Sequence, residues 1–95
     1  MISEKLVTNL TKAFDEDGDI IVGNEDQLIM IRSGAEGDEF YEITIEKVKG
    51  EGVDRTYEIL NTIPMEKNNH ETMKQAIEVY LNNGGSVNFL KYFDK

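Results

Sequence analysis

The chain has 95 residues and a formal net charge of −9, from 19 acids and 10 bases. It contains no cysteine, which excludes disulfides, thiolate metal sites and cysteine nucleophiles. This length predicts a single domain over residues 1–95. No apolar run approaches the roughly 20 residues that span a bilayer, and the polar residues 1–5 do not resemble a secretory signal, so we expect a cytoplasmic protein.

The first part of the chain predicts a helix over residues 3–14. Ser3 is a favourable N-cap, Ile2 and Val7 are spaced for a hydrophobic staple, and apolar residues recur at helical spacing up to residue 14. The acidic residues 15–19 do not continue this apolar stripe. We therefore expect the helix to end at residue 14 and the chain to turn at Gly18.

Four extended runs follow the helix and predict strands joined by short turns. They lie at residues 20–22, 28–31, 40–48 and 53–63, with a glycine-containing turn at 33–38. Consecutive strands joined in this way form an antiparallel meander. In the third run Tyr41, Ile43 and Ile45 alternate with polar residues, so we expect them to share the face that packs on the core.

The fourth run also alternates, and its pattern gives a definite expectation. Val53, Tyr57, Ile59 and Ile63 recur at odd positions and are expected to point inward. Proline cannot donate to a strand ladder, so we expect Pro64 to stop the sheet.

The C-terminal part predicts helices. Residues 70–82 form an amphipathic stripe that Asn68 or Asn69 can cap and that Gly84 can close. Residues 86–93 fit either a short helix capped by Ser86 or a strand. The expected class is α+β, an antiparallel sheet of three to four strands with an N-terminal helix and one or two C-terminal helices.

The charge is concentrated in the middle of the chain, because residues 15–58 contain fourteen acids and four bases. A strongly acidic chain is repelled by nucleic acid and by anionic membranes, so a partner that its charge attracts is basic. A solvated acidic surface that only keeps the protein soluble gives the same count.

The acidic residues 15–19 also suggest calcium. An EF-hand loop needs an acid at its first position, glycine at its sixth and glutamate at its twelfth. With Gly18 as the sixth position, Ala13 is first and Asn24 is twelfth, so we expect no specific calcium site. His70 has no second ligand of its type in the sequence, and we expect no metal, no cofactor and no enzymatic activity.

The most informative segment is the second predicted hairpin, residues 27–32 and 36–40. A strand that opens Gln-Leu-Ile and closes Ile-Arg is followed by Glu-Gly-Asp-Glu-Phe. This pattern resembles the central hairpin of a family of small, acidic, phage-encoded anti-CRISPR proteins from Listeria prophages, which inhibit the type II RNA-guided nuclease. The likeness is limited to about twenty residues, and this chain differs in its fourth strand and its neutral C-terminal part.

The resemblance implies a DNA mimic. In that family the hairpin tip enters the groove where the arginines of the nuclease recognise DNA, and arginines that grip guanine edges and phosphates also accept carboxylates. Carried over by position, the tip would bind the partner, and the neighbouring acidic run is a second candidate contact. The candidate partner-binding residues are Glu36, Gly37, Asp38, Glu39, Asp15, Asp17 and Asp19.

Two functions of different classes remain open at this point. The first is a non-enzymatic DNA mimic that binds a basic, nucleic-acid-binding protein, with the CRISPR nuclease as the suspected partner. The second is a structural or adaptor protein, monomeric or homodimeric, whose acidity serves solubility. The first predicts acids gathered on one surface, and the second predicts dispersed acids with an exposed apolar patch.

Overall fold

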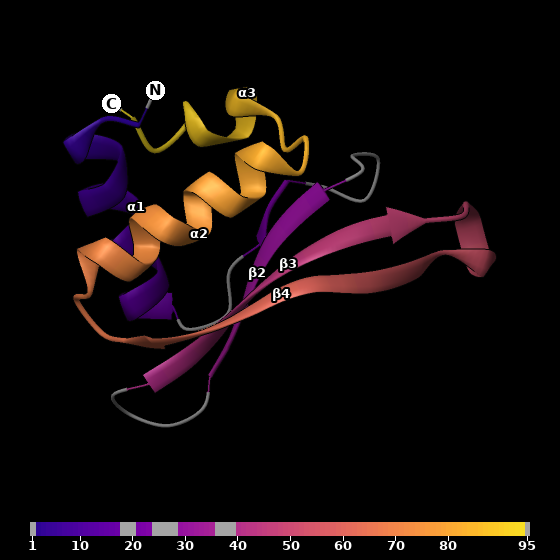
Figure 1. Cartoon of the computed structure of the whole chain (residues 1–95), viewed down its shortest axis with the longest axis horizontal. Helices are drawn as coiled ribbons and strands as arrows, with labels where there is room; N and C mark the ends of the chain where they lie inside the picture. The colour runs from indigo at the N-terminus through magenta and orange to yellow at the C-terminus, as the bar shows by residue number, and fades with distance from the viewer. Residues whose placement is uncertain (1, 18–20, 24–28, 36–39, 95) are drawn as a thin grey trace.

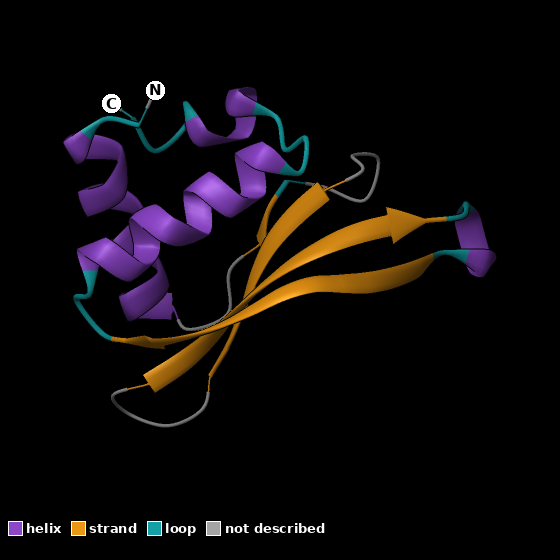
Figure 2. Cartoon of the chain, in the orientation of Figure 1, coloured by secondary structure: helices purple, strands orange, loops and turns teal. Residues whose placement is uncertain are grey.

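A computed structural model of the chain describes residues 2–17, 21–23, 29–35 and 40–94. It confirms the α+β class, because four antiparallel strands form one sheet in the order β1-β2-β3-β4 and the helices lie at the two ends of the sequence. Figures 1 and 2 show all three helices on one face of the sheet. The elements are α1 (Glu4–Asp17), β1 (Ile21–Val22), β2 (Ile29–Ala35), β3 (Phe40–Lys49), the 3₁₀ turn η1 (Gly52–Asp54), β4 (Thr56–Glu66), α2 (His70–Asn82) and α3 (Val87–Leu90).

The helices begin where their caps predict. The backbone N–H of Leu6 donates to Ser3 Oγ at 3.0 Å, and Asn69, not Asn68, caps α2 by accepting from the N–H of Thr72 at 3.1 Å. Ser86 caps α3, so the C-terminal segment is a short helix rather than a strand. No helix within the described ranges is long and apolar enough to cross a membrane.

The core lies between the helices and one face of the sheet. Leu10 and Phe14 of α1 and Ile77 and Tyr80 of α2 are fully buried, and they pack against the sheet residues Ile31, Ile43 and Ile45. The rings of Phe14 and Tyr41 meet edge to face at 6.3 Å. Burial of each such side chain is worth about 1.5–3 kcal/mol. The prediction that Tyr41, Ile43 and Ile45 of β3 face the core is therefore confirmed, since all three are buried in this layer.

The helix α1 is longer than the sequence indicated. It continues through the acidic residues to Asp17 instead of ending at residue 14. The apolar stripe does end there, but Asp15 is half-buried and accepts hydrogen bonds from the sheet side of the molecule. In the last turn of α1, a hydrogen-bonded carboxylate therefore contacts the sheet where an apolar side chain does so in the earlier turns.

The expected inward face of β4 was wrong over its first half. The predicted start at residue 53 was too early, because Val53 lies exposed in η1 and β4 begins at Thr56. Within β4, Ile59 is exposed and Tyr57 is more than one-third exposed, whereas Ile63 is half-buried as predicted. The exposure of Tyr57 and Ile59 follows from a β-bulge, because Ile45 pairs with Asn61 while Glu46 pairs with Ile59. Leu60 is the extra residue and packs against the core, so the alternation changes phase at this point.

Pro64 does not stop the sheet, since β4 continues to Glu66. The strand order leaves β4 with one neighbouring strand, β3, so it is an edge of the sheet. An edge strand tolerates proline where the missing N–H faces away from the neighbouring strand. The expected turn at 33–38 was also too long, since β2 continues to Ala35.

The close contact between Gly85 and Tyr80 generates a stability prediction. A Cβ on Gly85 would overlap the buried ring of Tyr80, whose hydroxyl donates to the carbonyl of Ser86 at 2.9 Å. We expect Gly85→Ala to lower the free energy of unfolding by about 1–3 kcal/mol. Gly34→Ala is the matched control, because nothing lies within 4 Å of its added Cβ. Urea unfolding of both variants checks this, and equal stability would contradict it.

Candidate functional site

Asp15 joins three segments at one end of the sheet. Its Oδ1 accepts a hydrogen bond from the Tyr41 hydroxyl at 2.9 Å, and its Oδ2 accepts one from the backbone N–H of Asn68 at 2.8 Å. Asn68 lies in the turn between β4 and α2 and has a left-handed φ of 63°, a conformation that asparagine tolerates better than most residues. The end of α1, the start of β3 and the start of α2 therefore meet at one carboxylate.

The Tyr41 hydroxyl is strongly perturbed by this environment. Burial raises the pKa of Tyr41 far above its usual range, and the hydrogen bond to Asp15 raises it further. A phenol that is buried and donates to a carboxylate holds its proton, because ionisation would place two negative charges side by side. The interaction is therefore structural across the neutral pH range.

Acids are concentrated at this end of the fold. Asp15 contacts Tyr41, and Phe40 pairs with Glu66, so the end of α1, the start of β3 and the end of β4 meet there. The described residues of these element ends and of the turn after β4 include five acids and one base, namely Asp15, Glu16, Asp17, Glu42, Glu66 and Lys67. In the sequence, the segments 13–20, 33–42 and 62–69 that hold these ends contain nine acids and one base, and the rest of the chain contains ten acids and nine bases. We call the meeting point of these element ends the acidic end, and Figure 1 shows the end of β4 and the start of β3 at the lower left.

The structure places the predicted partner-binding residues unequally. Asp15 is at the acidic end with both carboxylate oxygens in intramolecular hydrogen bonds. Asp17 is the last residue of α1. Asp19 and the hairpin tip Glu36, Gly37, Asp38 and Glu39 lie outside the described residues, although the strands that carry the tip, β2 and β3, are described and paired from Ala35–Tyr41 onward.

The face of the sheet away from the helices, the outer face, carries a polar cluster that the sequence did not indicate. Glu46 is buried there and accepts a hydrogen bond from the Thr44 hydroxyl at 2.6 Å. Arg32 lies 3.5 Å from Glu46 and 5.7 Å from the centre of the Tyr57 ring. The alternation of Thr44 and Glu46 with Ile43 and Ile45 was visible in the sequence, but the bulge that brings Tyr57 to this face was not.

An open groove of about 370 Å³ lies between the starts of α1 and α2. Its lining includes Ser3, Glu4, His70, Glu71 and Lys74. Its lining contains both acids and a lysine, and no group of three or more histidine, aspartate or glutamate side chains within the described ranges could hold a metal ion. The groove therefore offers neither a single-sign ligand site nor a ligand set for a cation.

Comparisons with protein-family models, with curated proteins and with solved structures found no match for this chain.

The contacts of Asp15 predict its contribution to stability. Asp15→Ala removes an acceptor from the Tyr41 hydroxyl and from the Asn68 N–H, and we expect a loss of about 1–3 kcal/mol in the free energy of unfolding. Glu16→Ala removes the exposed neighbouring acid and is expected to change stability by less than about 0.5 kcal/mol. Thermal and urea unfolding measure the stability of both variants. An equal effect of the two would show that the hydrogen bonds of Asp15 contribute nothing to the free energy of unfolding.

The raised pKa values of Tyr41 and Tyr80 predict a loss of stability at alkaline pH. The unfolded chain releases these protons near pH 10 while the folded chain holds them, so stability is fully present below about pH 10 and falls as the pH rises above it. We expect a slope of up to about 1.4 kcal/mol per pH unit for each group. Urea unfolding between about pH 8 and 11 should show a shallower slope for Tyr41→Phe than for the wild type.

Proposed function

We propose that this chain is a non-enzymatic DNA mimic that binds the nucleic-acid-binding surface of a basic protein through its acidic end. The observation that supports the proposal is the meeting of the end of α1, the start of β3 and the end of β4. The sequence segments that hold these ends contain nine acids and one base, while the rest of the chain is nearly balanced. A surface of one sign attracts a basic cleft and raises the rate of association with it. In sequence, residues 27–32 and 36–40 resemble the central hairpin of anti-CRISPR proteins that inhibit the type II RNA-guided nuclease. This nuclease is therefore the first partner to test.

The fold divides the acids of this end into two roles. Asp15 has both oxygens engaged with Tyr41 and Asn68, so it positions the segments that meet there. The tip acids Glu36, Asp38 and Glu39 follow β2 and precede β3, and both strands are anchored in the core by Ile31 and Ile43. Carboxylates on a hairpin with a rigid base lose little conformational freedom when they pair with arginines.

The proposal predicts the effect of removing the tip acids. The double variant Asp38→Ala with Glu39→Ala should weaken binding to the guide-loaded type II nuclease at least about tenfold, because each charge-assisted hydrogen bond is worth about 1.5–3 kcal/mol. Binding is measured by surface plasmon resonance, with duplex DNA that carries the recognition sequence of the nuclease as competitor. Affinity should also fall as salt rises, since salt screens exposed charges.

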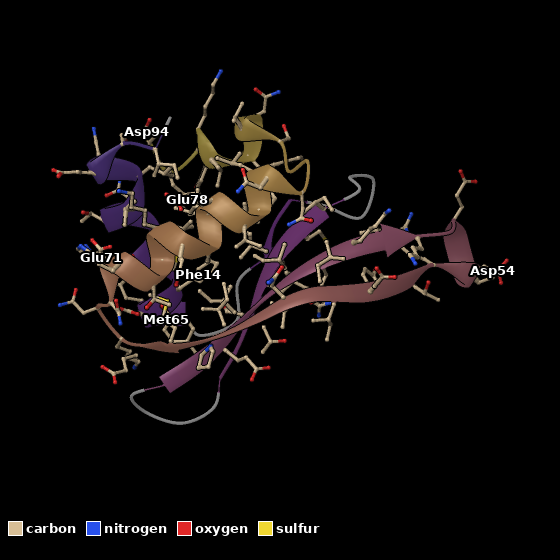
Figure 3. The ribbon with its side chains drawn as sticks, in the orientation of Figure 1. Phe14, Asp54, Met65, Glu71, Glu78 and Asp94 are labelled. Carbon is tan, nitrogen blue, oxygen red and sulfur yellow. The ribbon has the colours of Figure 1, made fainter. Side chains whose placement is uncertain are left out.

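The matched control is the double variant Glu4→Ala with Glu78→Ala. It removes the same charge from the helical layer, at the start of α1 and in the second half of α2, where Figure 3 labels Glu78, and should leave affinity within about twofold. Equal weakening by both double variants would mean that net charge alone drives binding. Binding that DNA does not compete with would contradict mimicry.

A further inference from the structure

The β3–β4 hairpin extends beyond the body of the molecule. The last described pair between β2 and β3 is Ile29 with Lys47, and past it the described residues of β3 and β4 stay paired with each other as far as η1. Val48 of this stretch is buried, whereas Tyr57 opposite it is 38% exposed. We call residues 47–58 the arm. Figure 1 shows no helix of the described chain over it, and Figure 3 shows Asp54 at its far end. A two-stranded ribbon is marginally stable in water, and it gains stability from a further strand.

The outward edge of the arm is open to such a strand. Residues 56–59 of β4 are all exposed, and β3 is the strand that pairs with β4. Natural edge strands are protected by prolines, bulges and charges. In β4 the proline is at position 64 and the bulge is at Leu60, so both lie on the body side of residues 56–59. Glu58 is the charge on this stretch, and Lys49 holds it in an ion pair across the ribbon.

Exposed apolar side chains lie beside this open edge. Ile59 is 58% exposed, Tyr57 is 38% exposed and Val53 at the tip is fully exposed. Tyr57 and Ile59 share the outer face, because their partners on β3 are Val48 and Glu46. Strand pairing along residues 56–59 would cover both side chains as well as the open backbone groups, and burial of apolar area drives such association.

The charge of the arm indicates which kind of chain pairs with its open edge. The arm contains three bases, Lys47, Lys49 and Arg55, and three acids, Glu51, Asp54 and Glu58. It is neutral in a chain of net charge −9, so the field that attracts a basic protein elsewhere gives no attraction here. Two copies of a strongly acidic chain repel one another over most surfaces, and they approach at least cost where the charge is balanced and both signs are present.

We propose that two copies of this chain associate through their arms, with the outward edges of β4 paired antiparallel about a two-fold axis. Such an interface is isologous, because the same residues face each other from both copies. The acidic end lies at the far end of β3 and β4 from the arm, so it stays exposed in the dimer.

The two contacts respond to salt in opposite directions, which separates this inference from the proposed function. The described residues extend 36 Å along their longest axis, and the Debye length is about 8 Å at physiological salt. Added salt screens the repulsion between two chains of charge −9 and should strengthen the dimer. The same salt should weaken binding of the acidic end to a basic partner.

Sedimentation velocity of the full chain tests the proposal. At about 5–500 µM protein we expect reversible dimerisation in the micromolar range, as for other small interfaces, with affinity rising between about 0.05 and 0.5 M NaCl. Ile59→Lys places a charge on the open stretch 56–59 of β4, beside the arm, and should weaken dimerisation at least about tenfold. The control is Ile21→Lys, on the other edge of the sheet, where the isoleucine is 53% exposed.

A second measurement locates the contact. The chain has no cysteine, so Thr56→Cys and Asn88→Cys each introduce a single exposed thiol, the first in the arm and the second on α3. A short bismaleimide should link two Thr56→Cys chains and leave Asn88→Cys chains single. A monomer at every concentration and salt would overturn the proposal, and so would equal loss of dimer in the two lysine variants or preferential linking through residue 88.

Discussion

The carboxylate of Asp15 holds the helical layer and the sheet together at the acidic end. It is half-buried, and the cost of removing it from water is offset by hydrogen bonds from Tyr41 and from the backbone of Asn68. Those bonds bring the end of α1 to the start of β3 and to the turn before α2. The acid-rich segments on either side are therefore gathered by a carboxylate that does not itself face a partner.

At the other end of the helical layer two hydrogen bonds join α1 and the residue before it to the C-terminal segment. Ser3 Oγ donates to Asp94 at 2.6 Å, and the side-chain amide of Asn9 donates to the carbonyl of Phe93 at 2.6 Å. Figure 1 shows the two termini side by side there. The helical layer is thus fixed to the C-terminal segment at one end and to the sheet at the other.

The sequence was sufficient for the features that depend on local chemistry. Ser3, Asn69 and Ser86 cap helices because a short side-chain oxygen satisfies a free N–H, and Tyr41, Ile43 and Ile45 alternate because one face of β3 is buried. The sequence was insufficient for features that depend on a residue or strand far away along the chain. The extension of α1 depends on Tyr41 as a hydrogen-bond donor to Asp15, and the position of Pro64 depends on β4 being an edge. The candidate site was predictable as a concentration of charge, but the meeting of its segments follows from long-range pairing.

The bulge at Leu60 has a consequence for how this surface can diverge. On the body side of Leu60, alternation is constrained because Ile63 and Met65 pack against the helices. On the arm side the phase is reversed, and Tyr57 and Ile59 contribute nothing to that core. The hydrophobic pattern that specifies the fold is therefore separated from the pattern that the arm displays. Substitutions at the exposed positions of residues 47–58 can therefore change which surface the arm recognises with little effect on the core between the helices and the sheet or on the charge of the acidic end.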